Sequence, residues 1–232
     1  MNLLAFDTST DILSIAVQGS GPGAVPIEFS GPGGARASST LIPAIQELLA
    51  RAGLRLTDLD AIVFGRGPGS FTGLRTACSV AQGLAFGAGV PVLAVDTLLA
   101  LAEDAHQRAG VQQVVAVLDA RMDEVYSACY ARQAGHWRQQ GLTALSPPEA
   151  LSAPPGWALA GNAFAAYGAR LPAAVARVEA LPTAAALLRV APMLIGAGQA
   201  GPAASATPLY IRDKVAQTTA ERAAARAATA DS

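Results

Sequence analysis

The sequence predicts an α/β protein of two related lobes, each with a mixed sheet flanked by helices. The chain has 232 residues, of which 52% are hydrophobic, which is enough for two compact cores. Short apolar runs of strand length alternate with longer segments of helical periodicity. A strand–aspartate–turn–strand pattern at the N-terminus also recurs in the second half of the chain. Together these three observations favour two copies of one α/β unit.

The first lobe is expected to begin with a hairpin and a third strand. Apolar Leu3 to Phe6 ends in the polar residues Asp7 to Asp11, and Leu13 to Gln18 alternates as a returning strand. A third short strand is expected near 26–29, and the glycine-rich segment 31–34 then leads to a helix. The expected caps of this helix are Ser38, Ser39 or Thr40, and its apolar face is Leu41, Ile45, Leu48 and Ala52.

A glycine-rich turn connects the next strand to a second helix. Apolar Ala61 to Phe64 runs directly into the stretch GRGPGSFTGLR at 65–75. The helix is expected over 71–88, with Ser70 or Thr72 as its cap. A buried strand therefore leads directly into a glycine-rich turn, whose backbone has more allowed conformations than that of other residues.

This second helix carries many small residues and few polar ones. Only Arg75 and Gln82 are strongly polar, so the helix is expected to be buried on more than one side. Its apolar face is Leu74, Ala77, Cys78, Ala81 and Leu84, and its small residues are Gly73, Ala77, Ala81, Gly83 and Ala85. Small residues let another helix pack closely, either within this chain or from a partner.

The opening hairpin recurs in the second half of the chain. Val115 to Leu118 is an apolar strand that ends in Asp119, and Asp123 precedes a second strand at 125–130. Both aspartates lie 112 positions after those of the first hairpin. An internal duplication explains this spacing, and chance similarity between two apolar–aspartate hairpins is the alternative.

The remaining elements complete the two lobes. They are expected as strand 91–95, helix 98–108, strand 137–144, a proline-rich link at 146–156, strand 158–160, helix 164–170, helix 183–197 kinked at Pro192, and a closing strand or extended tail at 209–215. The first lobe is therefore expected at 1–110 and the second at 111–216. The alanine-rich stretch 217–232 lacks an apolar stripe and is expected to fray.

The charge of the chain argues against nucleic-acid binding by this chain alone. The formal net charge is −1 and the only lysine is Lys214, so no basic field exists to hold a phosphate backbone. Charged residues make up only 14%, so part of the surface is expected to be apolar and covered by a partner. The N-terminal apolar run has no positive charge before it and stops at Asp7, which predicts a cytoplasmic protein without a signal peptide or membrane span.

The cysteines and histidines match no metal or redox spacing. Cys78 and Cys129 lie far apart in apolar segments and are expected to be buried thiols. His106 and His136 are expected to be solvated surface residues, and they do not form a histidine pair for zinc or iron. No metal ligand is therefore predicted among them.

Two hairpins of this kind suggest a cleft in which their tips face one another. Asp7 and Asp119 would then hold a hydrated Mg²⁺, while the hydroxyls and amides of Thr8, Ser9 and Thr10 contact phosphate oxygens. The alternative is that each aspartate caps a tight turn by accepting backbone hydrogen bonds. The sequence leaves these two interpretations open.

The glycine-rich turn matches no catalytic signature. A Walker loop needs a Gly-Lys-Ser/Thr that is absent here, and a dinucleotide fingerprint needs a third glycine where Ser70 stands. A nucleophile elbow needs Gly-x-Ser-x-Gly, but Ser70 directly follows Gly69. The turn is therefore expected to have a conformational role, because Gly67, Gly69 and Gly73 permit a positive φ or a close approach of another backbone.

Several stretches of the sequence resemble the bacterial TsaB (YeaZ) family. These stretches are LLAFDTST, GRGPGSFTGLR with the following AQGLAFGAGVPVLAVDTLLALA, LDARMDEVY and PLYIRDKVA. They occur in the same order from residue 1 to about 216, and GRGPGSFTGLR is highly specific. The resemblance implies an actin-like ATPase (ASKHA) fold of two related lobes.

The resemblance also implies a role in making threonylcarbamoyladenosine at position 37 of ANN-decoding transfer RNAs. It implies a non-catalytic subunit that supports its paralogue TsaD, which carries the metal and transfers the threonylcarbamoyl group, in a complex joined by the small ATPase TsaE. The catalytic paralogue binds its metal through histidines, and the matching region 35–40 has none here. No catalysis is therefore expected from this chain alone, no cofactor is assigned to it, and ATP with Mg²⁺ would act in the complex.

The first two helices and the turn between them are implied as the surface that binds TsaD. The same surface would form a homodimer when the paralogue is missing, and transfer RNA would be contacted only through the complex. The predicted partner-binding residues are Leu41, Ile45, Arg66, Gly67, Pro68, Gly69, Ser70, Phe71, Thr72, Gly73, Leu74, Arg75, Ala77, Cys78 and Ala81. Arginine in place of Ala77 or Ala81 is expected to abolish the contact.

A competing interpretation keeps the cleft of Asp7 and Asp119 active as a stand-alone ATPase or small-molecule kinase. It expects an adenine pocket with a clear Gly-Gly motif in the second lobe, for which the stretch 196–198, Gly-Ala-Gly, is a poor candidate. A third interpretation, an endopeptidase, lacks both a metal pair and a nucleophile motif.

Overall fold

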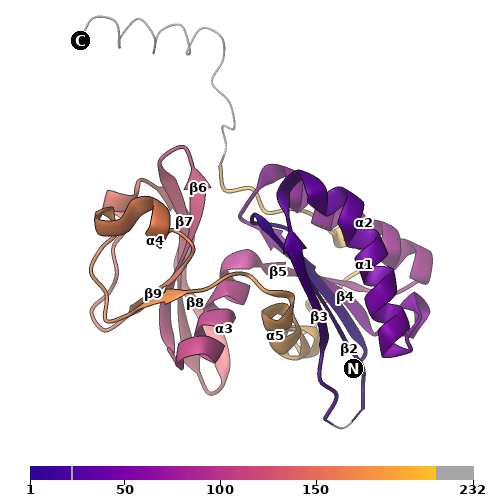
Figure 1. Cartoon of the computed structure of the whole chain (residues 1–232). Coiled ribbons are helices and arrows are strands. Elements are labelled where there is room, and N and C mark those ends of the chain that lie inside the picture. Colours follow the sequence, from indigo (N-terminus) through magenta and orange to yellow (C-terminus); the bar gives the residue numbers. More distant parts are fainter. Residues whose placement is uncertain (22, 213–232) are drawn as a thin grey trace, which may run out of the picture.

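The computed structural model describes residues 1–21 and 23–212, which form two lobes side by side (Figure 1). Each lobe contains one five-stranded mixed sheet. The first sheet has the order β3-β2-β1-β4-β5, with β1 (Leu3–Asp7), β2 (Ile12–Gln18), β3 (Ile27–Pro32), β4 (Ala61–Gly67) and β5 (Val92–Asp96). The second has the order β8-β7-β6-β9-β10, with β6 (Gln113–Arg121), β7 (Glu124–Gln133), β8 (His136–Ser146), β9 (Ala158–Gly161) and β10 (Arg177–Glu179). The α-helices of the described residues are α1 (Ala37–Ala52), α2 (Phe71–Ala88), α3 (Thr97–Ala109), α4 (Phe164–Tyr167) and α5 (Ala184–Gly196).

The two sheets have the same topology. In the first, β1 pairs antiparallel with β2 and parallel with β4. In the second, β6 pairs antiparallel with β7 and parallel with β9. The outer strands occupy equivalent places as well. This match supports an internal duplication and places Asp7 and Asp119 near the ends of equivalent central strands.

The central strand β1 is apolar from Leu3 to Phe6 because helices cover both faces of its sheet. Successive side chains of a strand point to opposite faces. Leu4 and Phe6 accordingly pack in the apolar cluster that contains α1 and α2, whereas Leu3 and Ala5 pack in the cluster that contains α3 and α5. A strand buried on both faces has a continuous apolar run instead of an alternating one.

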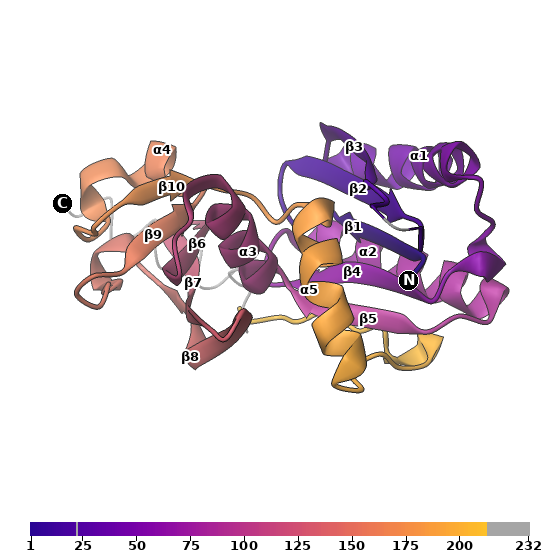
Figure 2. The same ribbon diagram turned by 90° about the horizontal axis from the view of Figure 1, so that it is seen from below.

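Helices α3 and α5 form a layer between the two sheets (Figure 2). Although α5 follows the second sheet in the chain, it packs against the first sheet, and α3 packs against α5 and the second sheet. One apolar cluster therefore contains Val63 of β4, Leu101 of α3, Ala116 of β6 and Leu187 of α5. The two lobes share this core.

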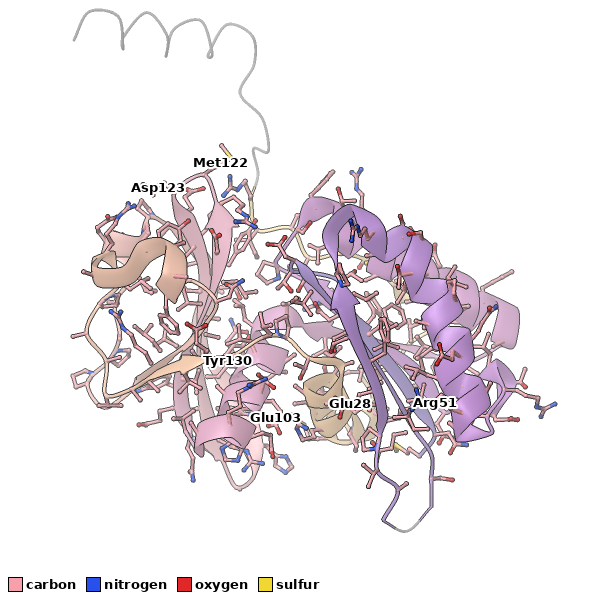
Figure 3. The ribbon with its side chains drawn as sticks, viewed as in Figure 1. Glu28, Arg51, Glu103, Met122, Asp123 and Tyr130 are labelled. Atoms are coloured by element: carbon pink, nitrogen blue, oxygen red, sulfur yellow. The ribbon has the colours of Figure 1, made fainter. Side chains whose placement is uncertain are left out.

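A buried carboxylate adds a polar connection to this shared layer. Glu103 of α3 is labelled in Figure 3. It accepts hydrogen bonds from Trp137 Nε1 on β8 at 2.8 Å and from Arg189 Nε on α5 at 3.1 Å. Burying a carboxylate is tolerated when its lone pairs are used in this way. Glu103 thus links α3 with β8 of the second sheet and with α5.

Most predicted elements are present, with differences at their ends. Helix α2 has the predicted bounds, and Ser70 caps it by accepting a hydrogen bond from Gly73 N at 3.4 Å. The predicted caps of α1 are wrong, because the helix begins at Ala37 after a turn of 3₁₀ helix and no side chain caps it. Strand β10 escapes prediction because its three residues, Arg-Val-Glu, show no apolar pattern.

The C-terminal predictions are only partly covered by the structure. Residues 209–212 join neither sheet. The remaining part of the predicted closing segment, 213–215, and the stretch 217–232 that is expected to fray lie outside the described residues. In the part of the chain that is described, no helix is long and apolar enough to cross a membrane.

Candidate functional site

The glycine-rich turn after β4 lies against the tip of the first hairpin. A side chain at Gly65 would overlap Asp7 Oδ2, and one at Gly73 would overlap the carbonyl oxygen of Thr8. Two hydrogen bonds fix the contact: Ser70 N donates to Ser9 O at 2.7 Å, and Thr8 Oγ1 donates to Gly73 O at 2.7 Å. The glycines are therefore needed so that two backbones can approach each other.

Asp7 is fully buried beneath this contact. Its Oδ1 accepts hydrogen bonds from Ser9 N at 2.8 Å and from Ser9 Oγ at 2.6 Å, while Oδ2 has no hydrogen-bond partner. Burial raises the pKa of the Asp7 carboxyl to about 6, although the hydrogen bonds from Ser9 act in the opposite direction. Asp7 caps its own turn and does not line the cleft.

Asp119 is likewise engaged within its own hairpin. Its Oδ1 accepts hydrogen bonds from Arg121 N and Tyr167 Oη, both at 2.8 Å, and Oδ2 pairs with Arg121 Nη1 at 3.1 Å. Within residues 1–21 and 23–212, no three acidic, histidine or cysteine side chains are grouped to hold a metal ion. These residues do not fit a Mg²⁺–nucleotide site, so the geometry favours the turn-capping interpretation for both aspartates.

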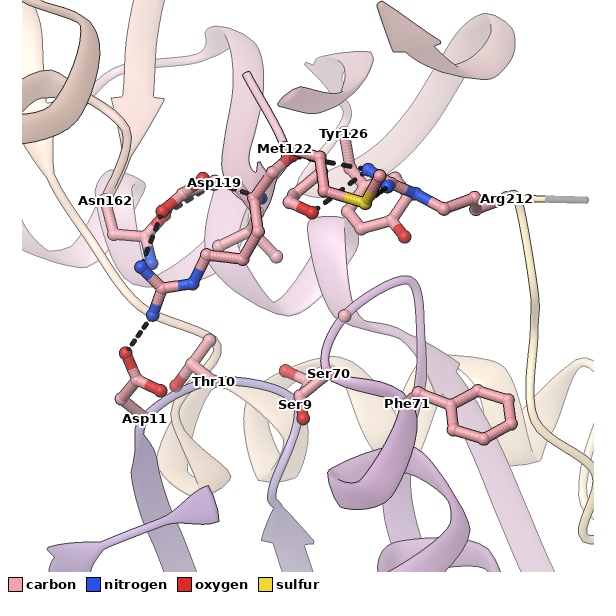
Figure 4. A pocket seen from close by; sticks show the side chains of 14 residues that line it. Ser9, Thr10, Asp11, Ser70, Phe71, Asp119, Met122, Tyr126, Asn162 and Arg212 are labelled. Carbon is pink, nitrogen blue, oxygen red and sulfur yellow. Dashed lines mark hydrogen bonds and ion pairs between the residues drawn. The ribbon is translucent and has the colours of Figure 1, made fainter. Parts of the chain in front are cut away.

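The hairpin tips do face one another across a cavity of about 300 Å³ (Figure 4). Arg121 spans it from the β6–β7 turn, since Nη2 pairs with Asp11 Oδ2 on the first hairpin at 2.6 Å. The hydroxyls proposed for phosphate contacts are used locally: Thr8 bonds to Gly73 O, Ser9 to Asp7, and Thr10 to Ile12. An exposed ion pair thus bridges the two lobes at this cleft.

Many of the predicted partner-binding residues lie inside the chain's own core. The buried ones are Leu41, Ile45, Gly67, Pro68, Gly73, Leu74, Ala77, Cys78 and Ala81. They cannot contact a partner in this conformation, and arginine at Ala77 or Ala81 would place a charge in the protein core instead of in an interface. This part of the prediction is corrected: the apolar face of α2 packs on the first sheet and α1.

The remaining predicted residues lie at or near the surface. Gly69 lies half-buried on the first hairpin, and Arg66 pairs through Nε with Asp96 Oδ1 at 2.5 Å. Ser70, Phe71, Thr72 and Arg75 are exposed at the start of α2.

We define the outer face of α2 by its solvent-facing side chains. These are Thr72, Arg75, Thr76, Ser79, Val80, Gln82, Gly83, Phe86 and Gly87. Phe86 is 83% exposed, and a side chain added at Gly83 or Gly87 would meet nothing within 4 Å. Near the start of the helix, Ser38 of α1 borders a shallow hollow on this face. This face carries one charge, on Arg75, and one amide, on Gln82, and its other residues are small, apolar or hydroxylated.

The segment 209–212 runs over the glycine turn and the start of α2. Leu209 N donates to Arg66 O at 2.8 Å, and the carbonyl oxygen of Leu209 lies 2.6 Å from where a Cβ at Gly67 would stand. Gly67 has a φ of +122°, which only glycine adopts readily. Arg212 Nη2 pairs with Glu124 Oε2 of β7 at 2.7 Å. The segment therefore connects the first lobe with the second hairpin.

The cysteines and histidines show no sign of a reactive site. Cys78 is buried, and burial raises the pKa of its thiol to about 11. Cys129 is only half-buried. His106 is also half-buried and not solvated as predicted, because it packs edge-on against Trp137 and its Nδ1 is 2.9 Å from Val111 O. His136 is exposed as predicted.

No pattern in the sequence indicates the contacts of four residues that shape the cleft or the segment 209–212, although three of them lie in stretches that carry the family resemblance. Arg121 is the last residue of β6, Tyr210 and Arg212 lie outside the helices and strands, and Tyr167 belongs to a short helix. Several of their contacts join residues far apart in the chain, such as Tyr167 with Asp119 at 48 positions and Tyr210 with Arg75 at 135 positions. Only the fold brings such pairs together.

Comparison with known proteins agrees with this architecture. The model of the family described as "TsaD: tRNA N6-adenosine threonylcarbamoyltransferase" matches residues 32–220. The solved structure of YeaZ from Pseudomonas aeruginosa superposes with a TM-score of 0.84 at 41% identity, covering 90% of this chain and 99% of that one. The predicted actin-like α/β fold of two mixed sheets flanked by helices is confirmed.

Two curated relatives are similar in sequence. The tRNA threonylcarbamoyladenosine biosynthesis protein TsaB of Escherichia coli K12 is 34% identical over 226 residues, covering 93% of this chain and 96% of the relative. The protein of the same name from Haemophilus influenzae is 44% identical over 135 residues, covering 57% of this chain and 55% of the relative. By sequence and fold, this chain belongs to the TsaB (YeaZ) family of tRNA threonylcarbamoyladenosine biosynthesis proteins.

Proposed function

We propose that this chain is a non-catalytic partner of the paralogue TsaD in threonylcarbamoyl transfer to adenosine 37 of ANN-decoding tRNAs. The chain binds TsaD through the outer face of α2 and supports it in the cytoplasm. TsaE joins the complex, and tRNA meets this chain only through it. When TsaD is absent, two copies of the chain pair through the same face.

The observation that carries this proposal is the pair of glycines on the outer face of α2. Glycine inside a helix costs about 1 kcal/mol relative to alanine. Gly73 has an internal reason for this cost, because the backbone of Thr8 lies against it. Gly83 and Gly87 have none, since a side chain there would point into open space. Close approach of a partner helix explains both, and it also covers the exposed ring of Phe86.

The interior of the cleft supports a non-catalytic role. Asp7 and Asp119 are used as turn caps, and Arg121 bridges the hairpins through its ion pair with Asp11. The alternative of a stand-alone ATPase or kinase therefore has less support, because it needs a carboxylate free to hold Mg²⁺.

The proposal is tested by reconstitution with each component omitted in turn. Purified chain, TsaD, TsaE, the threonylcarbamoyl adenylate and an ANN-decoding tRNA are mixed, and modified adenosine is measured by mass spectrometry. Transfer is expected with the complete mixture and is expected to be lost without TsaD and without this chain. Transfer by this chain in the absence of TsaD would overturn the proposal.

A substitution at Gly83 tests the surface itself. Gly83→Arg adds a charge where the isolated chain has room, so folding is expected to be unchanged. In the interface that charge would be buried without a partner, which costs roughly 3–5 kcal/mol, or more than 100-fold in affinity for TsaD. Gly196→Arg is the matched control, because Gly196 is an exposed glycine at the end of α5 that also has open space around it. Equal affinity of the two variants would contradict the assignment of this face.

A further inference from the structure

The segment 209–212 and the start of α2 form an exposed cluster around one cation. The guanidinium carbon of Arg75 lies 3.8 Å from the centre of the Phe71 ring. Its Nε donates to Tyr210 Oη at 3.1 Å, and the rings of Phe71 and Tyr210 lie 5.4 Å apart. A cation over an aromatic face is attracted by the ring's quadrupole. Two aromatic side chains thus hold one arginine in place at the surface.

Tyr210 is itself fixed from both sides. On one side, Leu209 N bonds to Arg66 O at 2.8 Å in the glycine turn. On the other, Arg212 pairs with Glu124 and donates from Nη2 to Ala120 O at 3.1 Å, with only 10% of its side chain exposed. The backbone is therefore fixed on both sides of Tyr210, although this residue belongs to no helix or strand. The anchoring limits the conformations open to Arg75 as well.

The two terminal nitrogens of Arg75 remain available. Among the described residues, Arg75 forms no ion pair, and its one hydrogen bond uses Nε. The side chain is the single charge on the outer face of α2, where its neighbours are Thr72, Thr76 and Ser79. The guanidinium group of Arg75 is thus ordered, with its terminal N–H donors in one plane, on a face whose other residues are uncharged.

We infer that Arg75 is the anchoring residue of the outer face of α2 and that the partner seated there offers it a carboxylate side chain. This inference rests on the proposed function, in which the partner is TsaD. Guanidinium and carboxylate groups match in a bidentate geometry, and arginine and aromatic side chains dominate the binding energy of many interfaces. Because the Arg75 side chain is already ordered in the free chain, it loses less conformational entropy on binding. Tyr210 is a positioning residue that acts through Arg75.

A protein carboxylate fits this cluster better than a nucleic-acid phosphate does. Binding to a phosphate backbone depends on several cations acting together. This face has one, and the formal net charge of the chain is −1. Binding of the isolated chain to tRNA is therefore the competing outcome that the experiment must detect.

The experiment measures the affinity of full-length variants for purified TsaD at low and high salt and, separately, for an ANN-decoding tRNA. Arg75→Gln is expected to weaken binding at least about tenfold and to remove most of its salt dependence. Arg75→Lys should recover only part of the affinity, because an ammonium lacks the planar fork. Tyr210→Phe keeps the ring but loses the acceptor for Nε, so a loss of about threefold is expected with the salt dependence retained. Arg138→Gln, at an exposed arginine of β8 in the other lobe, is the control and should bind like the wild type.

Each result decides one part of the inference. If Arg75→Gln binds TsaD like Arg138→Gln while Gly83→Arg does not bind, the outer face of α2 is still the binding surface, but the anchoring role of Arg75 is overturned. If Tyr210→Phe equals the wild type, the positioning role of Tyr210 is overturned. If the wild-type chain does not bind TsaD, or if Arg75→Gln impairs only binding of the isolated chain to tRNA, the carboxylate partner is overturned. Thermal unfolding of Arg75→Gln should match that of the wild type, since its charge is exposed; a large drop would mean that Arg75 serves the fold.

Discussion

At Asp7, burial and hydrogen bonding act on the carboxyl group in opposite directions. Burial raises the pKa to about 6, and the bonds from Ser9 only partly offset this effect. In the unfolded chain the pKa of an aspartate is about 3.9. The folded state therefore binds a proton more tightly than the unfolded state, so this group stabilises the protein fully below the unfolded pKa and less as the pH rises through 6.

Replacing Asp7 with asparagine should remove this pH dependence. An amide keeps an acceptor for Ser9 N and carries no charge to bury. The free energy of unfolding of Asp7→Asn relative to the wild type is expected to increase by up to about 3 kcal/mol between pH 4 and pH 7. Denaturant unfolding of both proteins across this range checks the prediction. If the difference in their free energies of unfolding stays constant with pH, ionisation of Asp7 does not destabilise the folded state.

Two glycines of helix α2 show that one residue type can serve two purposes within one element. The backbone of Thr8 lies against Gly73, whereas the space around Gly83 is open. We expect Gly73→Ala to lower the free energy of unfolding by roughly 1–3 kcal/mol, because the added methyl group overlaps a backbone carbonyl. Gly83→Ala should raise it by up to about 1 kcal/mol, because alanine favours the helix.

Thermal or denaturant unfolding of the two alanine variants gives the comparison directly. Both changes have the same chemistry and lie in the same helix, so each serves as the control for the other. A stabilised Gly73→Ala variant, or two variants with the same stability, would contradict the packing described for this helix.

The same helix shows what a sequence can and cannot predict at the level of an element. Its ends follow from local chemistry, since Ser70 caps the start and Gly89 ends it in the left-handed conformation. Its orientation is harder to predict because small residues surround it on every side. Ala77 and Ala81 face the sheet while Gly83 faces solvent, and only the packing of α2 against β4 distinguishes them. The predicted partner-binding residues on α2 therefore lie in large part on the side of the helix that faces the chain's own core.

For the whole molecule, the spacing of two aspartate pairs predicted the duplicated sheets. Strand order could follow from this repeat because each sheet is built from consecutive hairpin and crossover units. The crossing of α5 to the first sheet could not, because the apolar residues of α5 would suit either sheet. The contact between Arg121 and Asp11, which bridges the cleft, also depends on how the lobes are placed.

The shared core predicts that the first 110 residues do not fold alone. Without α5, the face of β1 that carries Leu3 and Ala5 is uncovered. A fragment 1–110 is expected to show no cooperative unfolding transition, in contrast to the full chain. Calorimetry together with amide NMR spectra checks this expectation, and adding the fragment 111–232 is the complementation control. A sharp transition in the isolated fragment would contradict the shared core.

The position of α5 also has a consequence for synthesis in the cell. The ribosome releases the N-terminus first, yet the helix that covers β1 and the residue that packs on Gly67 are translated near the end. The face of the first sheet that α5 later covers therefore stays exposed to solvent through most of translation, and its apolar side chains are open to aggregation. For this protein, the half that is made first is among the last to become native.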